Sequence, residues 1–322
     1  MAAVRIGAGL LALLAGVGLA AAPLAAGPAK PPAPVERPAA PAAPAAPQAP
    51  AAEPRPAIWL LEDADTRIYL FGTTHIFERG FRWRSPRLDR VIREADELVL
   101  ETDDEEAVDE TAIMRSMFMD KPVPILERVS PERREALRAL IERSGLPMEM
   151  WDQLHSFAAG FMLIAVQMNE GLDEGDDPEA RASGAEVELR AAFREMGRPV
   201  SAVESTEMQM GFFRSMSAEA QRGFLDMMVE ASSVPYEESG LSGDAAWATG
   251  NLEQIENEFE GMPRELYDVL LTRRNRNWTE WLARRLERPG TVLFAVGVGH
   301  LVGPDSVQNM LAARGLTARR ID

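Results

Sequence analysis

The sequence predicts an α/β fold with a central, mainly parallel sheet, built from strand–helix–strand units at the N- and C-terminal ends of the globular region, with a helical region between them. Three observations lead to this prediction. Residues 67–100 hold two apolar, strand-like segments separated by a helical pattern. Residues 291–321 repeat that order. The stretch between the two ends is dominated by apolar residues at helical spacing.

The first unit begins with a strand at residues 67–71, Arg-Ile-Tyr-Leu-Phe. Ser85 followed by Pro86 marks the start of a helix, because serine caps the free N–H groups of a first turn and proline fits its first position. The run Leu98-Val99-Leu100 is apolar throughout, which is typical of a parallel strand buried on both faces. A right-handed crossover makes these two strands parallel.

The last unit has the same plan. We expect a strand at residues 291–296, a helix at 304–314 and a closing strand at 316–321. Gly315 is the expected C-terminal cap of the helix, because glycine adopts the left-handed conformation that ends many helices.

The middle of the chain is expected to be helical, apart from a strand at residues 200–203. Its methionines either fill gaps in the core or line an adaptable apolar groove for a peptide or lipid. The predicted helices cover residues 130–145, 151–169, 185–196, 218–230 and 263–288, and the methionines are Met208, Met210, Met216, Met227 and Met228.

The N-terminal segment indicates export. Arg5 precedes an apolar run from Ile6 to about Ala22, which predicts a signal peptide or an uncleaved membrane anchor over residues 1–27. Residues 28–57 are almost entirely proline and alanine and are expected to be an extended linker, so the α/β domain would occupy residues 58–322. The expected location is the periplasm or the exterior, with anchoring in the inner membrane as the alternative.

Composition excludes several classes of partner. The chain has a formal net charge of -17, which argues against nucleic acid and anionic membrane surfaces, because both are bound by clustered Lys and Arg. It has no cysteine, so neither disulfides nor an acylated cysteine can be present. A peptide or a small molecule is the expected substrate.

Two similar motifs carry histidines. Gly72-Thr73-Thr74-His75 and Gly297-Val298-Gly299-His300 each come directly after a predicted strand, and together they hold two of the three histidines of the chain. Open α/β sheets bind ligands at the carboxyl ends of their strands. Each histidine could instead simply cap a loop by a hydrogen bond.

Several carboxylates are expected near these histidines. Glu101 ends the strand at 98–100 and should emerge at the same edge of the sheet as His75. Two imidazoles and one carboxylate suit a divalent metal that still binds water, so His75, Glu101 and His300 are the candidate metal ligands. Asp103 could support a ligand histidine, and the acids after it are expected to be solvated.

Other residues are candidates for catalysis. Glu204 ends the strand at 200–203, and Glu186 begins a helix, where an acid can also simply favour the helix dipole. Either could act as a general base. Arg274, next to Asn275 and near Trp278, could stabilise an oxyanion or belong to a surface patch. His155, in an apolar helical segment, is expected to be a core or surface histidine with its hydrogen bonds satisfied.

These residues together resemble the TraB/GumN family. The resemblance is carried by Trp59 to Leu61, Tyr69 to His75, Leu98 to Glu101, Gly184 to Gln209, Arg274-Asn275 with Trp278, and Phe294 to Gly303, in that order along the chain. The family is related to the TIKI proteases, described as metal-dependent peptidases with paired G-x-x-H motifs, and more remotely to the erythromycin-esterase-like and ChaN-like group. The resemblance implies a site of His75, Glu101 and His300 for manganese or cobalt rather than zinc.

The sequence therefore leads to the hypothesis of an exported, metal-dependent hydrolase, with a peptidase as the favoured class. The metal would polarise a scissile carbonyl and activate water. Two other classes stay open. One is a non-catalytic protein that binds a peptide or sequesters a metal in the same cleft, and the other holds haem through the histidines.

Overall fold

The structure is a computed structural model that describes residues 53–75, 77–78, 80–102, 110–168, 182–234 and 245–321. The predicted signal peptide and most of the predicted linker lie outside these residues, as do Asp103 and the acidic residues after it. Within the described residues, no helix is both long enough and apolar enough to cross a membrane.

The core of the fold is a six-stranded sheet with the order β6-β4-β7-β2-β1-β8. Strands β6, β4, β7 and β2 pair in parallel, and β1 and β8 extend the sheet by antiparallel pairing. This arrangement confirms the predicted α/β class with a mainly parallel sheet. The strands are β1 (Ile58–Glu62), β2 (Thr66–Thr73), β4 (Glu97–Thr102), β6 (Val200–Glu204), β7 (Gly290–Gly297) and β8 (Arg319–Arg320).

Strand β7 lies between the two strands of the first predicted unit. It pairs with β2 on one side, from Thr66↔Gly290 to Thr73↔Gly297, and with β4 on the other. The carboxyl ends of β2, β7, β4 and β6 therefore lie side by side at one edge of the sheet. This edge receives both G-x-x-H motifs together with Glu101 and Glu204.

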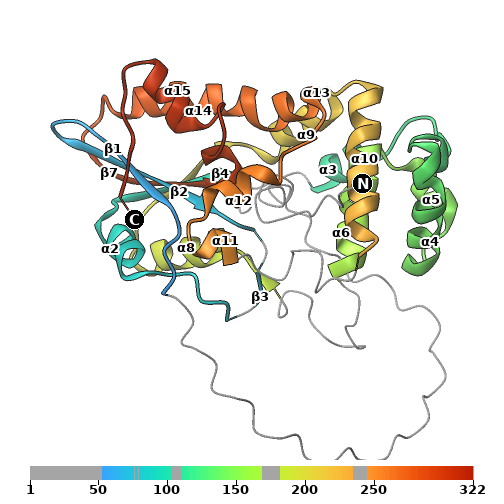
Figure 1. The fold of residues 1–322 in the computed structure, drawn as a ribbon, viewed down its shortest axis with the longest axis horizontal. Helices are drawn as coiled ribbons and strands as arrows, with labels where there is room; N and C mark the ends of the chain where they lie inside the picture. The colour runs from blue at the N-terminus through green and yellow to red at the C-terminus, as the bar shows by residue number, and fades with distance from the viewer. Residues whose placement is uncertain are drawn as a thin grey trace, which may run out of the picture.

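Helices cover both faces of the sheet (Figure 1). On one face, α14 (Arg273–Arg285) and α15 (Val307–Ala313) pack Trp278, Leu282 and Leu311 against the strands. On the other face, α2 (Pro86–Glu94) and α8 (Ala185–Glu195) bury their apolar sides. Burial on both faces explains why the central strands are apolar throughout.

The remaining helices gather largely beside the sheet, at the end away from the β1–β2 hairpin (Figure 1). That end holds the carboxyl edge. These helices are α3 (Glu110–Met117), α4 (Arg134–Ser144), α5 (Met148–Gln153), α6 (Ser156–Met168), α9 (Thr206–Arg214), α10 (Ala218–Ser232) and α13 (Arg264–Tyr267). The short helices α11 (Ala245–Ala248) and α12 (Leu252–Asn257) lie closer to the strands, near α8 (Figure 1). A two-stranded sheet pairs β3 (Phe77–Glu78) with β5 (Ala182–Ser183).

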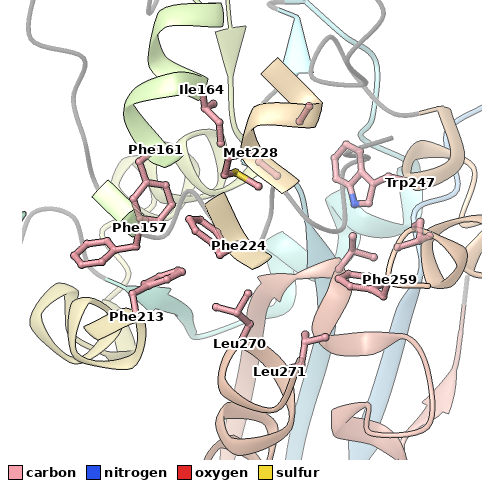
Figure 2. Packing of buried hydrophobic residues seen from close by; sticks show 14 of the residues in the cluster. Phe157, Phe161, Ile164, Phe213, Phe224, Met228, Trp247, Phe259, Leu270 and Leu271 are labelled. Atoms are coloured by element: carbon pink, nitrogen blue, oxygen red, sulfur yellow. The ribbon is translucent and has the colours of Figure 1, made fainter. Parts of the chain in front are cut away.

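An aromatic core holds the helical region together. Figure 2 shows Phe157 and Phe161 of α6 meeting Phe213 of α9 and Phe224 of α10. The rings of Phe161 and Phe213 are 5.2 Å apart and nearly perpendicular, an arrangement favoured by the quadrupoles of the two rings. Met228 is fully buried in the same core, whereas Met208 is 48% exposed, so the methionines mainly fill the core.

Local signals at helix ends are confirmed. The Ser85 side chain caps α2, accepting a hydrogen bond from the N–H of Leu88 at 3.1 Å. Gly145 ends α4 and Gly315 comes after α15, both with positive φ angles of 70° and 79°. These are positions where glycine has little steric cost.

The structure also corrects several element predictions. Residues 151–169 do not form one helix, because α5 ends at Gln153 and α6 begins at Ser156. His155 lies in this break and its N–H donates to the carbonyl of Met117. The predicted helix at 263–288 contains a π-helical turn at Asp268–Thr272, and the closing strand is only two residues long.

Residues just before β1 already contact the domain. The N–H of Arg55 donates to the carbonyl of Ala248 at 2.7 Å, and Ala57 is buried with 3% exposure.

We expect a variant that begins at Ile58 to have a lower melting temperature than one that begins at Glu53. One lost backbone hydrogen bond contributes about 1 kcal/mol, which lowers the melting temperature by roughly 2–4 °C in a domain of this size. Equal melting temperatures would show that this contact adds nothing.

Candidate active site at the carboxyl edge of the sheet

A buried guanidinium lies at the centre of the candidate site. Arg274, in the first turn of α14, is 2% exposed. Its Nη2 donates to Glu101 Oε2 at 2.6 Å and to Glu204 Oε2 at 2.7 Å, and its Nε donates to both oxygens of Glu204 at 3.0 Å. A carboxylate from β4 and another from the end of β6 thus hold one arginine of α14.

His300 completes this group, which we call the Arg274 cluster (Arg274, Glu101, Glu204 and His300). Asn275 Nδ2 donates to the carbonyl of Asp305 at 2.8 Å, so its Oδ1 is the atom that faces His300 Nδ1 at 2.5 Å. An amide oxygen only accepts, so the proton of the neutral imidazole is on Nδ1. The lone pair is then on Nε2, which accepts from Arg274 Nη1 at 3.1 Å.

Neighbouring groups occupy the remaining acceptor atoms of the cluster. The N–H of Gly297, at the end of β7, donates to Glu101 Oε1 at 2.6 Å. Glu204 Oε1 accepts from Trp278 Nε1 at 2.9 Å, and Glu204 Oε2 accepts from Gln209 Nε2 at 3.1 Å. The ring of Trp278 also lies 4.8 Å from the guanidinium carbon of Arg274, within range of a cation–π interaction.

Burial shifts the pKa of two members of this cluster, Glu101 and His300. Burial raises the pKa of Glu101, and the nearby charge of Arg274 offsets this only in part. Burial, the charge of Arg274 and the charge of His75 together lower the pKa of His300 well below its ordinary value. His300 is therefore a neutral imidazole at neutral pH.

His75 is at the more accessible side of the same edge. Its side chain is 12% exposed, and its Nδ1 lies 3.0 Å from Glu186 Oε1, in the first turn of α8. Burial raises the pKa of Glu186, but the charge of His75 and the polar side chains of His75 and Thr73 nearby outweigh this effect, so the pKa is lowered overall. Glu186 is the ionised partner of this histidine.

A close approach of two backbones positions this pair. The N–H of Ala185 donates to the carbonyl of Thr74 at 3.0 Å. A Cβ on Gly184 would lie 2.4 Å from the carbonyl oxygen of His75 and 3.2 Å from Glu186 Oε2. Only glycine leaves room for the start of α8 to reach the His75 loop.

All six predicted site residues thus lie at this edge, in two groups. Glu101, Glu204, Arg274 and His300 form the buried cluster, and Glu186 pairs with His75. Their chemical roles stay predictions. His155 belongs to neither group. Its ring stacks on that of Phe157, with the ring centroids 5.6 Å apart.

Sequence reasoning did not find the contacts of Asn275, Gln209 and Gly184. The spacing of Arg274 and Trp278 by one helical turn indicates that their side chains lie together, because residues four apart share a helix face. No sequence pattern indicated the π-helical turn before α14. Such turns shift the phase of a helix and are frequent at functional sites.

The residues as placed do not fit the predicted metal ion. The single lone pair of His300 is directed at Arg274, and the guanidinium lies against both carboxylates. His75 is held by Glu186 instead of joining Glu101 and His300. In the part of the chain that the structure describes, no three His, Asp or Glu side chains are grouped so that they could hold a metal.

The lowered pKa of His300 predicts how stability depends on pH. The folded state binds fewer protons than the unfolded state, so this contribution to stability is present above the unfolded pKa of about 6.5 and is lost as pH falls below it. Over this range the free energy of unfolding falls by about 1.4 kcal/mol per pH unit. We expect the melting temperature of His300→Gln to depend less on pH than that of the wild type between about pH 6.5 and pH 5.

His155→Gln is the comparison for this measurement. The pKa of His155 is also lowered, by burial and by Arg128 and Arg214, but its side chain is partly exposed, so its removal should change the slope less. A wild-type slope that His300→Gln leaves unchanged would contradict a neutral, buried His300.

The close approach at Gly184 predicts the effect of an added methyl group. Gly184→Ala should destabilise the protein by about 1–3 kcal/mol, the usual cost of overpacking, because the obstructing atom belongs to the backbone. Gly211→Ala in α9 is the matched control, since its Cβ meets no atom within 4 Å, and it should be neutral or stabilising. Denaturant unfolding measures both, and equal stability of the two variants would rule out the proposed contact.

Comparisons with known proteins agree with the resemblance noted in the sequence. A sequence model of the TraB/PrgY/gumN family matches residues 57–320. The chain is 23% identical over 265 residues to a protein named "Uncharacterized protein YbaP" from Escherichia coli (strain K12), covering 80% of this chain and 92% of that protein. YbaP of Shigella flexneri matches with the same identity and coverage. No solved structure matches. The family match runs from the residue before β1 to the end of β8, and the chain therefore belongs to the TraB/PrgY/gumN family.

Proposed function

We propose that this protein is an exported hydrolase that acts on peptides, with His75 as the group that takes a proton from the attacking water. The observation that carries the proposal is the pairing of a partly exposed His75 with an ionised Glu186, 3.0 Å away at the carboxyl edge of the sheet. A histidine oriented by a carboxylate is the usual arrangement of a general base.

Glu186 has a positioning role in this proposal. In this proposal the reacting form of His75 is the neutral imidazole. With Nδ1 held by the carboxylate, its Nε2 atom would accept the proton, and the negative charge of Glu186 would stabilise the imidazolium that forms. The buried Arg274 cluster lies close enough that His75 acts on the pKa of both Glu101 and His300. Its role would be to hold the carboxyl ends of β4, β6 and β7 together with α14.

The peptide substrate rests on the resemblance to the TIKI proteases, and export rests on the apolar N-terminal segment. We propose the periplasm as the location, with a membrane tether through residues 1–27 if the segment is not cleaved. The proposed reaction does not use the metal ion that the sequence suggested, because the positions of the donor atoms do not fit an ion.

We predict that His75→Ala lowers kcat/KM for a peptide substrate by roughly 100-fold or more, the usual contribution of a general base. Glu186→Gln should lower it less, because the amide still orients the ring without its charge. Turnover would be followed with a quenched peptide library, and circular dichroism would show that each variant is folded. His155→Gln is the control and should match the wild type.

A second candidate is a protein that binds a peptide without hydrolysing it. This alternative is favoured because every N–H group of Arg274 already donates to an acceptor within the protein. Arg274 therefore has no N–H group left to stabilise a developing oxyanion. Binding of library peptides without turnover, at an affinity that His75→Ala lowers, would support this alternative and overturn the hydrolase.

A further inference from the structure

We infer that Arg274 takes the place of the metal ion, so that a built-in guanidinium is the resident cation of this site. Its nitrogens lie 2.6–3.1 Å from atoms of Glu101, Glu204 and His300. These are two carboxylates and one imidazole, which are ordinary ligands of manganese, cobalt and zinc. The side chains surround a cation as metal ligands would, but the cation belongs to the chain.

The count of donors and acceptors supports this inference. A guanidinium has five N–H groups, and those of Arg274 find acceptors in Glu101, Glu204, His300 Nε2 and the carbonyl of Leu270. A neutral imidazole has one lone pair, and that of His300 points at Arg274. A metal could use His300 only after Arg274 had left.

Charge leads to the same conclusion. Two carboxylates and one guanidinium in direct contact leave a single formal negative charge at this buried position. A divalent ion added between Glu101 and His300, whose Oε1 and Nε2 atoms are 3.6 Å apart, would lie against the guanidinium and be repelled by it. With the guanidinium removed, two carboxylates and an imidazole would be left without a cation.

The fold also fixes Arg274 where it lies. Nη1 donates to the carbonyl of Leu270 at 3.3 Å, within the π-helical turn, and Trp278 covers the guanidinium from the next turn of α14. The neighbouring arginine has a different environment. Arg273 is 53% exposed and pairs with Asp268 at 2.6 Å, so it is a matched control for removing an arginine at this point of the helix.

The test compares the wild type, Arg274→Ala and Arg273→Ala. Each is purified without a metal-binding tag, analysed for bound metal by mass spectrometry, and melted with added Co²⁺, Mn²⁺ or a chelator. We expect the wild type and Arg273→Ala to hold no stoichiometric metal. The melting temperature of each should be unchanged by added Co²⁺, Mn²⁺ or chelator. Arg274→Ala should bind one Co²⁺, and its melting temperature should rise by roughly 5–10 °C at a cobalt concentration about 100 times the dissociation constant.

A second substitution identifies the ligands. Adding His300→Gln to Arg274→Ala should abolish the rise with Co²⁺, because the imidazole is then missing. A folded Arg274→Ala variant that binds no metal would overturn the inference. So would a wild type with stoichiometric metal that His300→Gln releases, and this measurement decides the question even if Arg274→Ala does not fold. None of these readouts depends on turnover, so a failed peptidase assay and a failed metal assay are distinguishable.

Discussion

The buried positive charge of Arg274 is the constraint on which the carboxyl edge of the sheet depends. A guanidinium stays charged at every pH that the protein experiences, so an arginine that is 2% exposed must have its charge and its N–H groups satisfied within the fold. Carboxylates from β4 and β6 and an imidazole just after β7 supply these partners. Removing one partner of a buried ion pair costs roughly 3–5 kcal/mol, so this contact holds the three strands and α14 in one arrangement.

The balance of charge around Arg274 determines which groups are ionised. Burial raises the pKa of Glu101, the charge of Arg274 opposes this rise, and the nearby Glu204 adds to it. Burial and the same guanidinium lower the pKa of His300, so its Nε2 atom carries no proton and stays a hydrogen-bond acceptor. His75 has the opposite environment, since it meets the ionised Glu186 at an accessible position. Two histidines in similar motifs are thereby suited to different tasks.

The helical region contributes the elements that place the arginine. Its aromatic core joins α6, α9 and α10 beside the sheet, and the chain then returns through α13 and the π-helical turn into α14 (Figures 1 and 2). The extra residue of a π turn rotates the later part of a helix relative to the earlier part. Leu270 and Leu271 before this point are buried in the aromatic core, and Arg274 and Asn275 after it face the edge of the sheet.

Much of the fold could be predicted from local signals. The caps at Ser85, Gly145 and Gly315 act within a few residues, so the elements that they bound were predictable. The position of both G-x-x-H motifs at strand ends was also predictable, because the strands before them are continuous apolar runs. The break at His155 and the π turn leave no local pattern and were missed.

The sequence by itself therefore determined which residues reach the carboxyl edge, because side-chain periodicity and helix caps are local properties. Only the tertiary structure decided which of them meet. Strand β7 enters between β2 and β4 from about 190 residues further along the chain, and this brings Gly297 and His300 next to Glu101. The pairing of His75 with Glu186, and of Arg274 with both carboxylates, results from that packing. Such contacts depend on the balance of buried charge across separate elements, which no stretch of sequence records.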